Sequence, residues 1–447
     1  MKTVLRSSTR KPQTFSGRAR SHSSPRTSRA AEAPLKFLPE LTSPDATRII
    51  AGRTLRGFAD GFVSVLLAQY LSDLGFSPVA IGAIVTGTLL GSAGMTLLFG
   101  LRGRAISFKA RLLAAAGMMA ITGVGFASTV WFWPLMVIAV LGTLNPSAGD
   151  VSVFLPTEQA YVAGLAEPSS RPRIFAIYNL GAIFAGAFGA LVSGLPSLVA
   201  HRNGWHVATA DRSGFVLYAV VAVIIFVIYA GLHRHGEPEP QPALPEGERR
   251  RALHTSRRTV LELAALFSLD SAGSGFVVTS LLVLWLHLRF GLSPAATGGL
   301  FFAAGLLGAA SQVLAPVLAR RIGLIRTMAY THIPANILLI LAAFAPRGGV
   351  AVGLLLARSL FAQMDVPARQ AFVMAVVPAD ERAAASSVTN VPRSLASATT
   401  PLLAGLLLSS SDVGWPLVIA GTMKIVYDVI LLVLYRSVPE HEGASRT

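Results

Sequence analysis

A four-residue stretch occurs twice in the chain, as Gly75-Phe76-Ser77-Pro78 and as Gly291-Leu292-Ser293-Pro294, and this repeat indicates the fold. The copies are 216 residues apart, and a glycine follows four residues after each proline, at Gly82 and Gly298. Each copy lies between the first and second apolar runs of one half of the chain. The chain therefore contains two related halves.

A second repeated stretch strengthens this relationship. Residues 156–161 (PTEQAY) correspond to residues 367–372 (PARQAF) at an offset of 211, and the same offset aligns Arg171 with Arg382 and Asn179 with Asn390. With six membrane spans in each half, both halves begin and end on the same face of the membrane. The halves are therefore expected to lie parallel, related by an axis along the membrane normal.

The composition is that of a membrane protein, because 53% of the 447 residues are hydrophobic and 13% are charged, whereas soluble chains carry about 25% charged residues. Twelve apolar runs, each near or above the roughly 20 residues that cross a bilayer, predict an all-α membrane protein with twelve transmembrane helices in two six-helix pseudo-symmetric bundles. The chain has no cysteine, which excludes disulfides and thiolate metal sites. The runs lie near residues 51–73, 79–101, 111–130, 135–163, 174–199, 214–233, 260–287, 294–319, 326–345, 350–377, 383–408 and 414–435.

Basic residues predict the orientation. The even-numbered loops and their borders carry 16 Lys and Arg residues, against 4 for the odd-numbered loops. Cytoplasmic loops are enriched in basic residues, so we expect a multi-pass protein of the plasma (inner) membrane with both termini in the cytoplasm. The expected domains are a basic disordered tail (1–48), the N-terminal bundle (49–233), a cytoplasmic linker (234–258), the C-terminal bundle (259–436) and a second tail (437–447). A processed targeting segment is the alternative for the first 45 residues, which are rich in Arg and Ser.

The paired halves and their basic loops resemble the major facilitator superfamily over residues 50–436. Residues 318–323 (LARRIG) with Arg326 look like the basic loop motif of that superfamily, with Arg320 where an aspartate is usual, and residues 100–104 (GLRGR) are its counterpart. The stretch 367–405 is similar to drug-exporter branches, but residues 181–194 lack the proline of their fifth span. The resemblance implies alternating access around a cavity lined by the first, fourth, seventh and tenth spans, and it names no substrate.

Two carboxylates near mid-membrane are candidates for proton coupling. Ionisable groups inside a bilayer are costly unless they are paired or wet, so each is a functional candidate. Asp60 lies four residues from Arg56 on the first span, and a structural pair with Arg56 is the alternative to a role in coupling. Asp270 has no basic residue within four positions, so it must either bind a proton or find an arginine from another helix.

Other polar residues on the cavity spans are candidates for solute binding and gating. Glu158 and Arg369 occupy matched repeat positions with opposite charge and could form a salt bridge between the halves in one state only; the alternative is that each is satisfied within its own half. The substrate-cavity candidates are Arg56, Gln69, Asp150, Arg358, Gln363 and Asp365. The gating or interdomain candidates are Glu158, Arg369, Arg102, Arg104, Arg320 and Arg321.

Absent motifs separate the function classes. No lysine follows a glycine, so the chain has no Walker loop, and neither H-E-x-x-H nor G-x-S-x-G occurs. We therefore expect no enzyme activity, no cofactor and no metal site, and no nucleic-acid partner. The sequence predicts a secondary active transporter of a small organic solute, coupled to protons, with a monomer as the favoured state. An uncoupled uniporter, or a receptor or structural protein that does not transport, is the alternative.

Overall fold

The computed structural model describes residues 43–102, 106–147, 154–165, 171–233, 256–378, 381–411 and 413–435, which are helical almost throughout. These residues all belong to one compact unit of the chain. Of the predicted tails and linker, residues 1–42, 234–255 and 437–447 lie outside the described residues.

The N-terminal half is built from helices α1 to α8. Ser43 and Ser107 cap α1 and α3, because their hydroxyls accept hydrogen bonds from the N–H groups of Asp45 and Ala110; such caps satisfy N–H groups that have no partner within the helix. The helices are α1 (Pro44–Asp73), α2 (Pro78–Arg102), α3 (Phe108–Ser128), α4 (Phe132–Leu141), α5 (Phe154–Leu165), α6 (Arg171–Val192), α7 (Leu195–Asn203) and α8 (Val207–Ala230).

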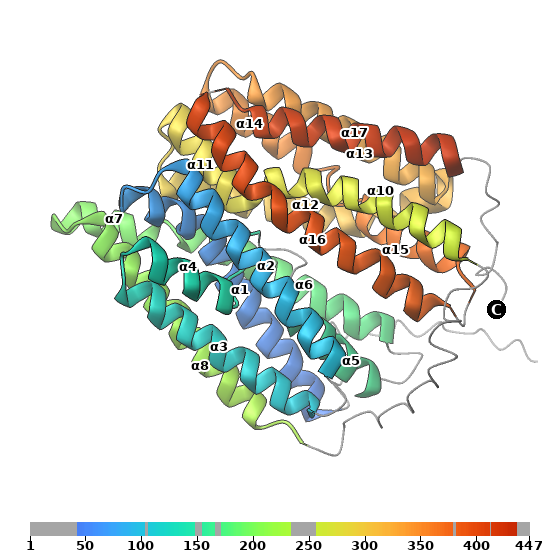
Figure 1. Cartoon of the computed structure of the whole chain (residues 1–447), viewed down its shortest axis with the longest axis horizontal. Coiled ribbons are helices and arrows are strands. Elements are labelled where there is room, and N and C mark those ends of the chain that lie inside the picture. Colours follow the sequence, from blue (N-terminus) through green and yellow to red (C-terminus); the bar gives the residue numbers. More distant parts are fainter. Residues whose placement is uncertain are drawn as a thin grey trace, which may run out of the picture. The chain divides into compact units, whose positions relative to one another are not determined.

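The C-terminal half is built from helices α10 to α17. They are α10 (Arg257–Phe276), α11 (Thr279–Phe290), α12 (Pro294–Ile322), α13 (Leu324–Ala343), α14 (Gly348–Ser359), α15 (Asp365–Val376), α16 (Arg382–Ser410) and α17 (Trp415–Tyr435). In Figure 1 the helices of the N-terminal half run from blue to green and those of the C-terminal half from yellow to red.

The repeated four-residue stretch forms the same turn in both halves. Gly75 and Gly291 have φ values of 83° and 64°, a left-handed conformation that glycine adopts without a steric penalty. The hydroxyls of Ser77 and Ser293 then accept hydrogen bonds of 3.3 Å from the N–H groups of Ala80 and Ala296 at the start of α2 and α12. The repeat in the sequence is therefore also a repeat in the structure.

Within the described residues, eight helical stretches are long and apolar enough to cross a membrane. The other four predicted spans correspond to α1 and α16, which carry more polar residues, and to the interrupted pairs α4–α5 and α14–α15. The all-helical architecture is as predicted, and the count of twelve is consistent with it.

The two halves pack in the same way. Helix α1 packs most extensively on α6, and α3 on α8; the equivalent pairs in the C-terminal half are α10 with α16 and α13 with α17. Between the halves the main contacts are α2 with α16, which lie side by side in Figure 1, and α6 with α12. This arrangement gives a symmetric interface of two helix pairs.

Small residues bring the halves together at one end of the bundle. We call it the turn end, because the Gly75 and Gly291 turns lie there, and we call the opposite end, where α1 begins and α17 ends, the terminal end. A Cβ atom on Gly82 would lie 2.6 Å from the carbonyl oxygen of Pro401, and one on Gly298 would lie 2.5 Å from that of Ala190. Only glycine allows such close backbone approach, so the halves are tightly closed at the turn end.

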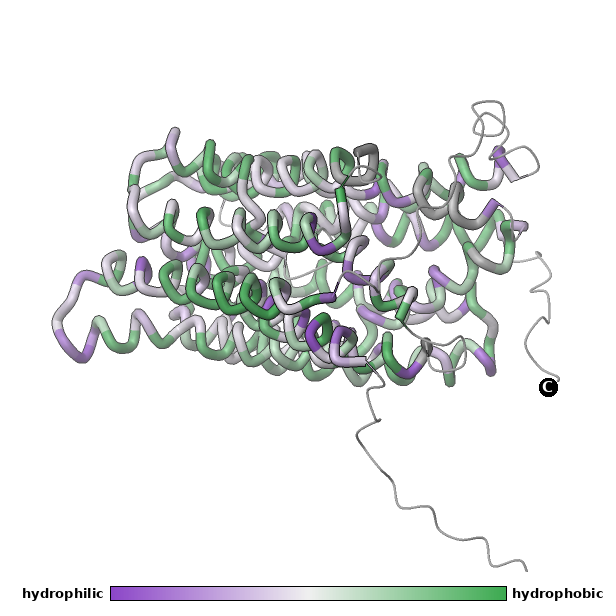
Figure 2. The backbone as a smooth tube through the Cα atoms, turned by 90° about the horizontal axis from the view of Figure 1, so that it is seen from below, coloured by the Kyte–Doolittle hydropathy of each residue, from purple (hydrophilic) through white to green (hydrophobic). Residues whose placement is uncertain are grey.

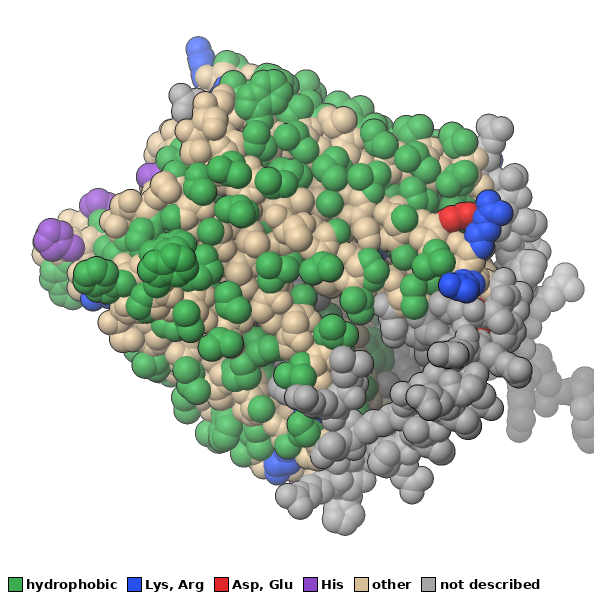
Figure 3. Space-filling view, in the orientation of Figure 1, with side chains coloured by type: hydrophobic (Ala, Val, Ile, Leu, Met, Phe, Trp, Pro, Cys, Tyr) green, Lys and Arg blue, Asp and Glu red, His purple; other side chains and the backbone are tan. Residues whose placement is uncertain are grey.

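The outer surface is apolar. Large hydrophobic side chains such as Val124, Val137 and Val227 are more than half exposed, and Figure 3 shows hydrophobic side chains spread over the face in view. Hydrophilic residues lie mainly towards the helix ends in Figure 2, with a few between them. A surface of this kind is suited to lipid.

Candidate functional site

Interrupted helices mark the centre of the molecule. The pairs α4–α5, α10–α11 and α14–α15 belong to the fourth, seventh and tenth predicted spans, and each pair is broken within its span. Ser280, at the start of α11, donates a hydrogen bond of 2.7 Å from its hydroxyl to the carbonyl oxygen of Ser64 on α1, and its N–H donates to that of Pro146 in the α4–α5 connection. Non-helical backbone at membrane depth is found where it is buried in protein or lines a cavity.

A buried ion pair occupies the centre of the N-terminal half. Arg56 on α1 donates a hydrogen bond of 2.6 Å to Glu158 on α5, and both side chains are fully buried. Tyr178 on α6 and Tyr229 on α8 donate to the same carboxylate over 2.5 and 2.6 Å. Glu158 therefore ties four helices together.

Asp60 lies close to this pair without joining it. Its one hydrogen bond to a described residue comes from the amide of Asn145 in the α4–α5 connection, at 3.5 Å, and no described cation lies within ion-pair distance. The structural pair between Arg56 and Asp60, which the sequence analysis gave as the alternative to a role in coupling, is not formed in this conformation, since Arg56 pairs with Glu158 instead. Asp60 is nevertheless buried, with 6% of its surface exposed.

The C-terminal half holds a larger buried cluster of charges. Asp270 on α10 accepts hydrogen bonds from Lys424 on α17, at 2.7 Å, and from Arg369 on α15, at 3.2 Å. Arg369 also contacts Asp365, one turn away on α15, at 3.1 Å. Asp270 therefore finds the arginine from another helix that the sequence analysis gave as one of its two options.

His332 extends the cluster to α13. Its Nδ1 lies 3.0 Å from the carboxylate of Asp428 on α17, and its Nε2 lies 3.9 Å from Asp270. Sequence reasoning did not name the partners of Lys424 and His332, although both lie in apolar spans. The spacing of four residues between Lys424 and Asp428 suggests a pair within one helix, and no spacing in the sequence tells which helix His332 contacts. The structure pairs them between helices instead.

Glu158 and Arg369 do not meet in this conformation. Glu158 is held by Arg56 and two tyrosines within the N-terminal half, and Arg369 by Asp270 and Asp365 within the C-terminal half. The geometry thus favours the alternative in which each charge is satisfied in its own half.

Arg358 lies just before the break between α14 and α15, and Gln363 lies within it. No described side chain forms a hydrogen bond or ion pair with Arg358, and its Nε atom is buried without a partner. Gln363 accepts a long hydrogen bond of 3.4 Å from Gln312 on α12. These two candidates therefore present polar groups next to a non-helical segment.

The remaining candidates form no contact with the two groups of buried charges or lie outside the described residues. Gln69 is buried and donates to Asp73 at 3.1 Å near the end of α1, and Arg320 and Arg321 are exposed at the end of α12. Asp150 and Arg104 lie outside the described residues, as does the side chain of Arg102.

A further polar group lies at the terminal end, six residues before the predicted first span. Asp45 accepts hydrogen bonds from Arg48 at 2.8 Å, from Tyr161 at 3.0 Å and from the N–H of His233 at 3.0 Å. Burial acts to raise the pKa of the Asp45 carboxyl, but the hydrogen bonds from His233, Arg48 and Tyr161 outweigh burial and hold this pKa below its ordinary value. Asp45 thereby fastens the start of α1 to α5 and to the end of α8.

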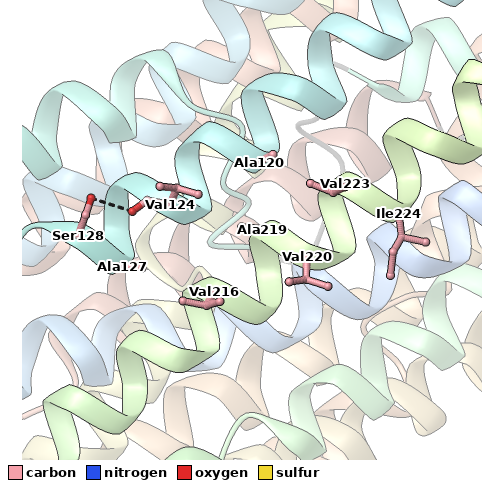
Figure 4. Close-up of a pocket in the computed structure, with 9 residues that line it drawn as sticks. All are labelled: Ala120, Val124, Ala127, Ser128, Val216, Ala219, Val220, Val223 and Ile224. Atoms are coloured by element: carbon pink, nitrogen blue, oxygen red, sulfur yellow. Dashed lines mark hydrogen bonds between the residues drawn. The ribbon is translucent and has the colours of Figure 1, made fainter.

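An apolar groove of about 500 Å³ lies between α3 and α8. Figure 4 shows Val124, Val216 and Val220 among its lining residues, with the Ser128 hydroxyl turned back to the carbonyl oxygen of Val124. Because Val124, Val216 and Val220 are about half exposed on the apolar outer surface, this groove suits lipid chains and offers nothing to a polar solute.

Comparison with known proteins finds relatives over most of the chain. The family model of the Major Facilitator Superfamily matches residues 49–362. The uncharacterized membrane protein YJR124C of Saccharomyces cerevisiae is 26% identical over 441 residues, which cover 92% of this chain and 97% of the yeast protein. Two solved structures share the fold at TM-scores of 0.68: a point mutant of the nucleoside transporter NupG, with 14% identity over 87% of this chain and 99% of NupG, and a D-xylose-proton symporter, with 16% identity over 89% and 99%.

Proposed function

The chain belongs to the Major Facilitator Superfamily, and on this premise we propose that it is a secondary active transporter of a small organic solute, coupled to protons. Membership of this family and the shared fold with solved transporters support a multi-pass membrane transporter rather than an enzyme. The observation that carries the proposal is the set of buried charges beside the interrupted helices. A scaffold gains little from burying so many charges, because desolvation of an ion pair often outweighs its attraction.

Alternating access is supported by the way the halves meet. Close glycine contacts join α2 to α16 and α6 to α12 at the turn end. The even-numbered loops and their borders carry 16 basic residues and the odd-numbered loops carry 4. This excess favours a protein of the plasma membrane whose terminal end and both chain termini face the cytoplasm. On this orientation the conformation is closed to the outside, and transport requires these contacts to separate.

Asp60 is the carboxylate that we propose takes the transported proton. Its described partners amount to one amide at 3.5 Å, whereas Asp270 is held by Lys424 and Arg369. A buried carboxylate with no cation within ion-pair distance is stabilised by protonation. The contacts therefore put Asp60 ahead of Asp270 as the coupling residue, and Asp270 serves to hold two cations between α10, α15 and α17.

The proposal is tested with purified protein in two steps. A thermal-shift screen of sugars, nucleosides, amino acids and organic acids identifies a ligand, because a bound solute stabilises the folded state by mass action. Proteoliposomes loaded with that ligand should then accumulate its labelled form by counterflow, and an inward proton gradient should drive net uptake. A solute that binds but never exchanges would instead identify a receptor.

A further inference from the structure

The guanidinium of Arg358 is a cation that no described residue pairs with. It lies on the last full turn of α14, immediately before the break at residues 360–364, and its side chain is largely but not completely enclosed. Its Nε is buried without a hydrogen-bond partner, and none of the described residues forms an ion pair with it. Arginine has five N–H donors that require acceptors when they are removed from water.

The nearby acids are already paired with other cations. Asp270 and Asp365 act on Arg358 electrostatically but do not reach it. Asp270 accepts from Lys424 and Arg369, and Asp365 accepts from Arg369. The third acid of the cluster, Asp428, is paired with His332. Among the described cations near these acids, Arg358 is therefore the one that remains available for an external anion.

A second arginine in the N-terminal half is in a similar position. The Nε of Arg53 on α1 is buried without a hydrogen-bond partner, and its guanidinium rests over the ring of Tyr178 at 5.4 Å. Arg53 precedes Asp60 by seven residues and Ser64 by eleven, spacings that place all three on one face of the helix. The backbone carbonyl oxygen of Ser64 accepts a hydrogen bond from the Ser280 hydroxyl of the other half.

We infer that the transported solute carries a carboxylate that binds the guanidinium of Arg358; this inference rests on the proposed transport function. The planar fork of arginine matches a carboxylate with two parallel hydrogen bonds. Two acids close to Arg358 repel a dianion more strongly than a monoanion, which favours a monocarboxylate over a phosphate ester. If a carboxylate bound at Arg358 and a proton bound at Asp60 crossed the membrane together, transport would move no net charge.

Matched acid and amide pairs test the inference. The purified full-length chain is heated with lactate or lactamide, with benzoate or benzamide, and with nicotinate or nicotinamide, at constant ionic strength in chloride. We expect at least one acid to raise the Tm with increasing concentration and its amide to have no comparable effect. Equal stabilisation by acid and amide, or no stabilisation by any acid, would overturn the inference.

Variants then locate the carboxylate. Arg358→Gln should weaken the apparent affinity for the stabilising acid about tenfold or more, because a charge-assisted bidentate contact is lost. Arg358→Lys keeps the charge and should retain part of this affinity. Arg347→Gln, an exposed arginine at the other end of the same helix, should bind like the wild type. Unchanged affinity in a folded Arg358→Gln protein would contradict the assignment.

Counterflow of the labelled acid separates this inference from the transport proposal. If a neutral solute exchanges while no acid binds, the protein is a transporter and the role of Arg358 is wrong. If an acid binds through Arg358 but is never exchanged, the binding site stands and the transport function fails.

Discussion

Lys424 on α17 donates a hydrogen bond of 2.7 Å to Asp270 on α10, a residue 154 positions earlier in the chain. The hydroxyl of Ser274 also accepts a hydrogen bond from this lysine, at 2.7 Å. The pair joins the helix that is broken in mid-span to the last helix of its half. It neutralises a carboxylate that has no cation near it in the sequence.

We predict that Asp270→Asn destabilises the protein by about 3 to 5 kcal/mol, because Lys424 and Arg369 would keep their charges in a buried site after losing a partner. The Tm of the purified variant in detergent measures this loss. The double variant Asp270→Asn with Lys424→Gln should recover part of the stability, since it removes one stranded charge. A double variant no more stable than the less stable single variant would contradict the pairing.

We predict that Asp60→Asn abolishes proton-driven accumulation and preserves counterflow, because exchange of bound solute does not require release of the proton. Uptake and counterflow are measured in the same proteoliposomes, with and without a pH gradient. Glu262→Gln is the matched control: Glu262 is 43% exposed and pairs with Arg258 four residues earlier on α10. If Asp60→Asn still accumulates solute with wild-type pH dependence, the coupling residue lies elsewhere.

Exchanging the charges of Arg56 and Glu158 should restore part of the counterflow activity and of the Tm, whereas exchanging those of Glu158 and Arg369 should restore neither. Glu158→Arg alone should lose counterflow activity and lower the Tm, since two arginines would face each other in a fully buried site. Adding Arg56→Glu should restore part of both. Adding Arg369→Glu should restore neither, because Arg369 contacts Asp270 and Asp365; rescue by that change would show that Glu158 and Arg369 meet in another conformation.

Gly82→Ala should loosen the closed turn end, because its Cβ would lie 2.6 Å from the carbonyl oxygen of Pro401. The chain has no cysteine, so Ser193→Cys, on a buried residue at the α6–α12 contact, gives a single reactive thiol. In intact cells a membrane-impermeant maleimide should label this thiol severalfold faster when Gly82→Ala is also present. Gly117→Ala, where a Cβ meets nothing within 4 Å, is the control. Equal rates in the two backgrounds would argue against the glycine contact as the closing element.

The contacts of ionised Asp45 should stabilise the folded protein at neutral pH, and this stabilisation should be lost in acid. The pKa of Asp45 is lower in the folded protein than its ordinary value, so the contribution is fully present above the unfolded pKa of about 3.9 and disappears as the pH falls through the folded-state pKa. The Tm difference between the wild type and Asp45→Asn should therefore be constant near neutral pH and shrink below about pH 4. A difference that does not change with pH would mean that the charge of Asp45 contributes nothing.

The spans, the two halves and the repeated turns could be predicted from the sequence alone, because each depends on residues close together in the chain. Helical spans follow from apolar runs, and the turns at Gly75 and Gly291 follow from local stretches in which only glycine adopts a positive φ easily. The polar residues inside the spans could likewise be identified one by one, since any ionisable group at that depth is conspicuous.

Only the tertiary structure decided which of these residues are partners. Sequence spacing suggested Arg56 with Asp60, Lys424 with Asp428 and, across the halves, Glu158 with Arg369. The structure pairs Arg56 with Glu158 and Lys424 with Asp270, and it leaves Arg358 without a described partner. The physical reason is that ion pairing falls off within a few ångströms, while the rotation and packing of helices about 100 or more residues apart set those distances.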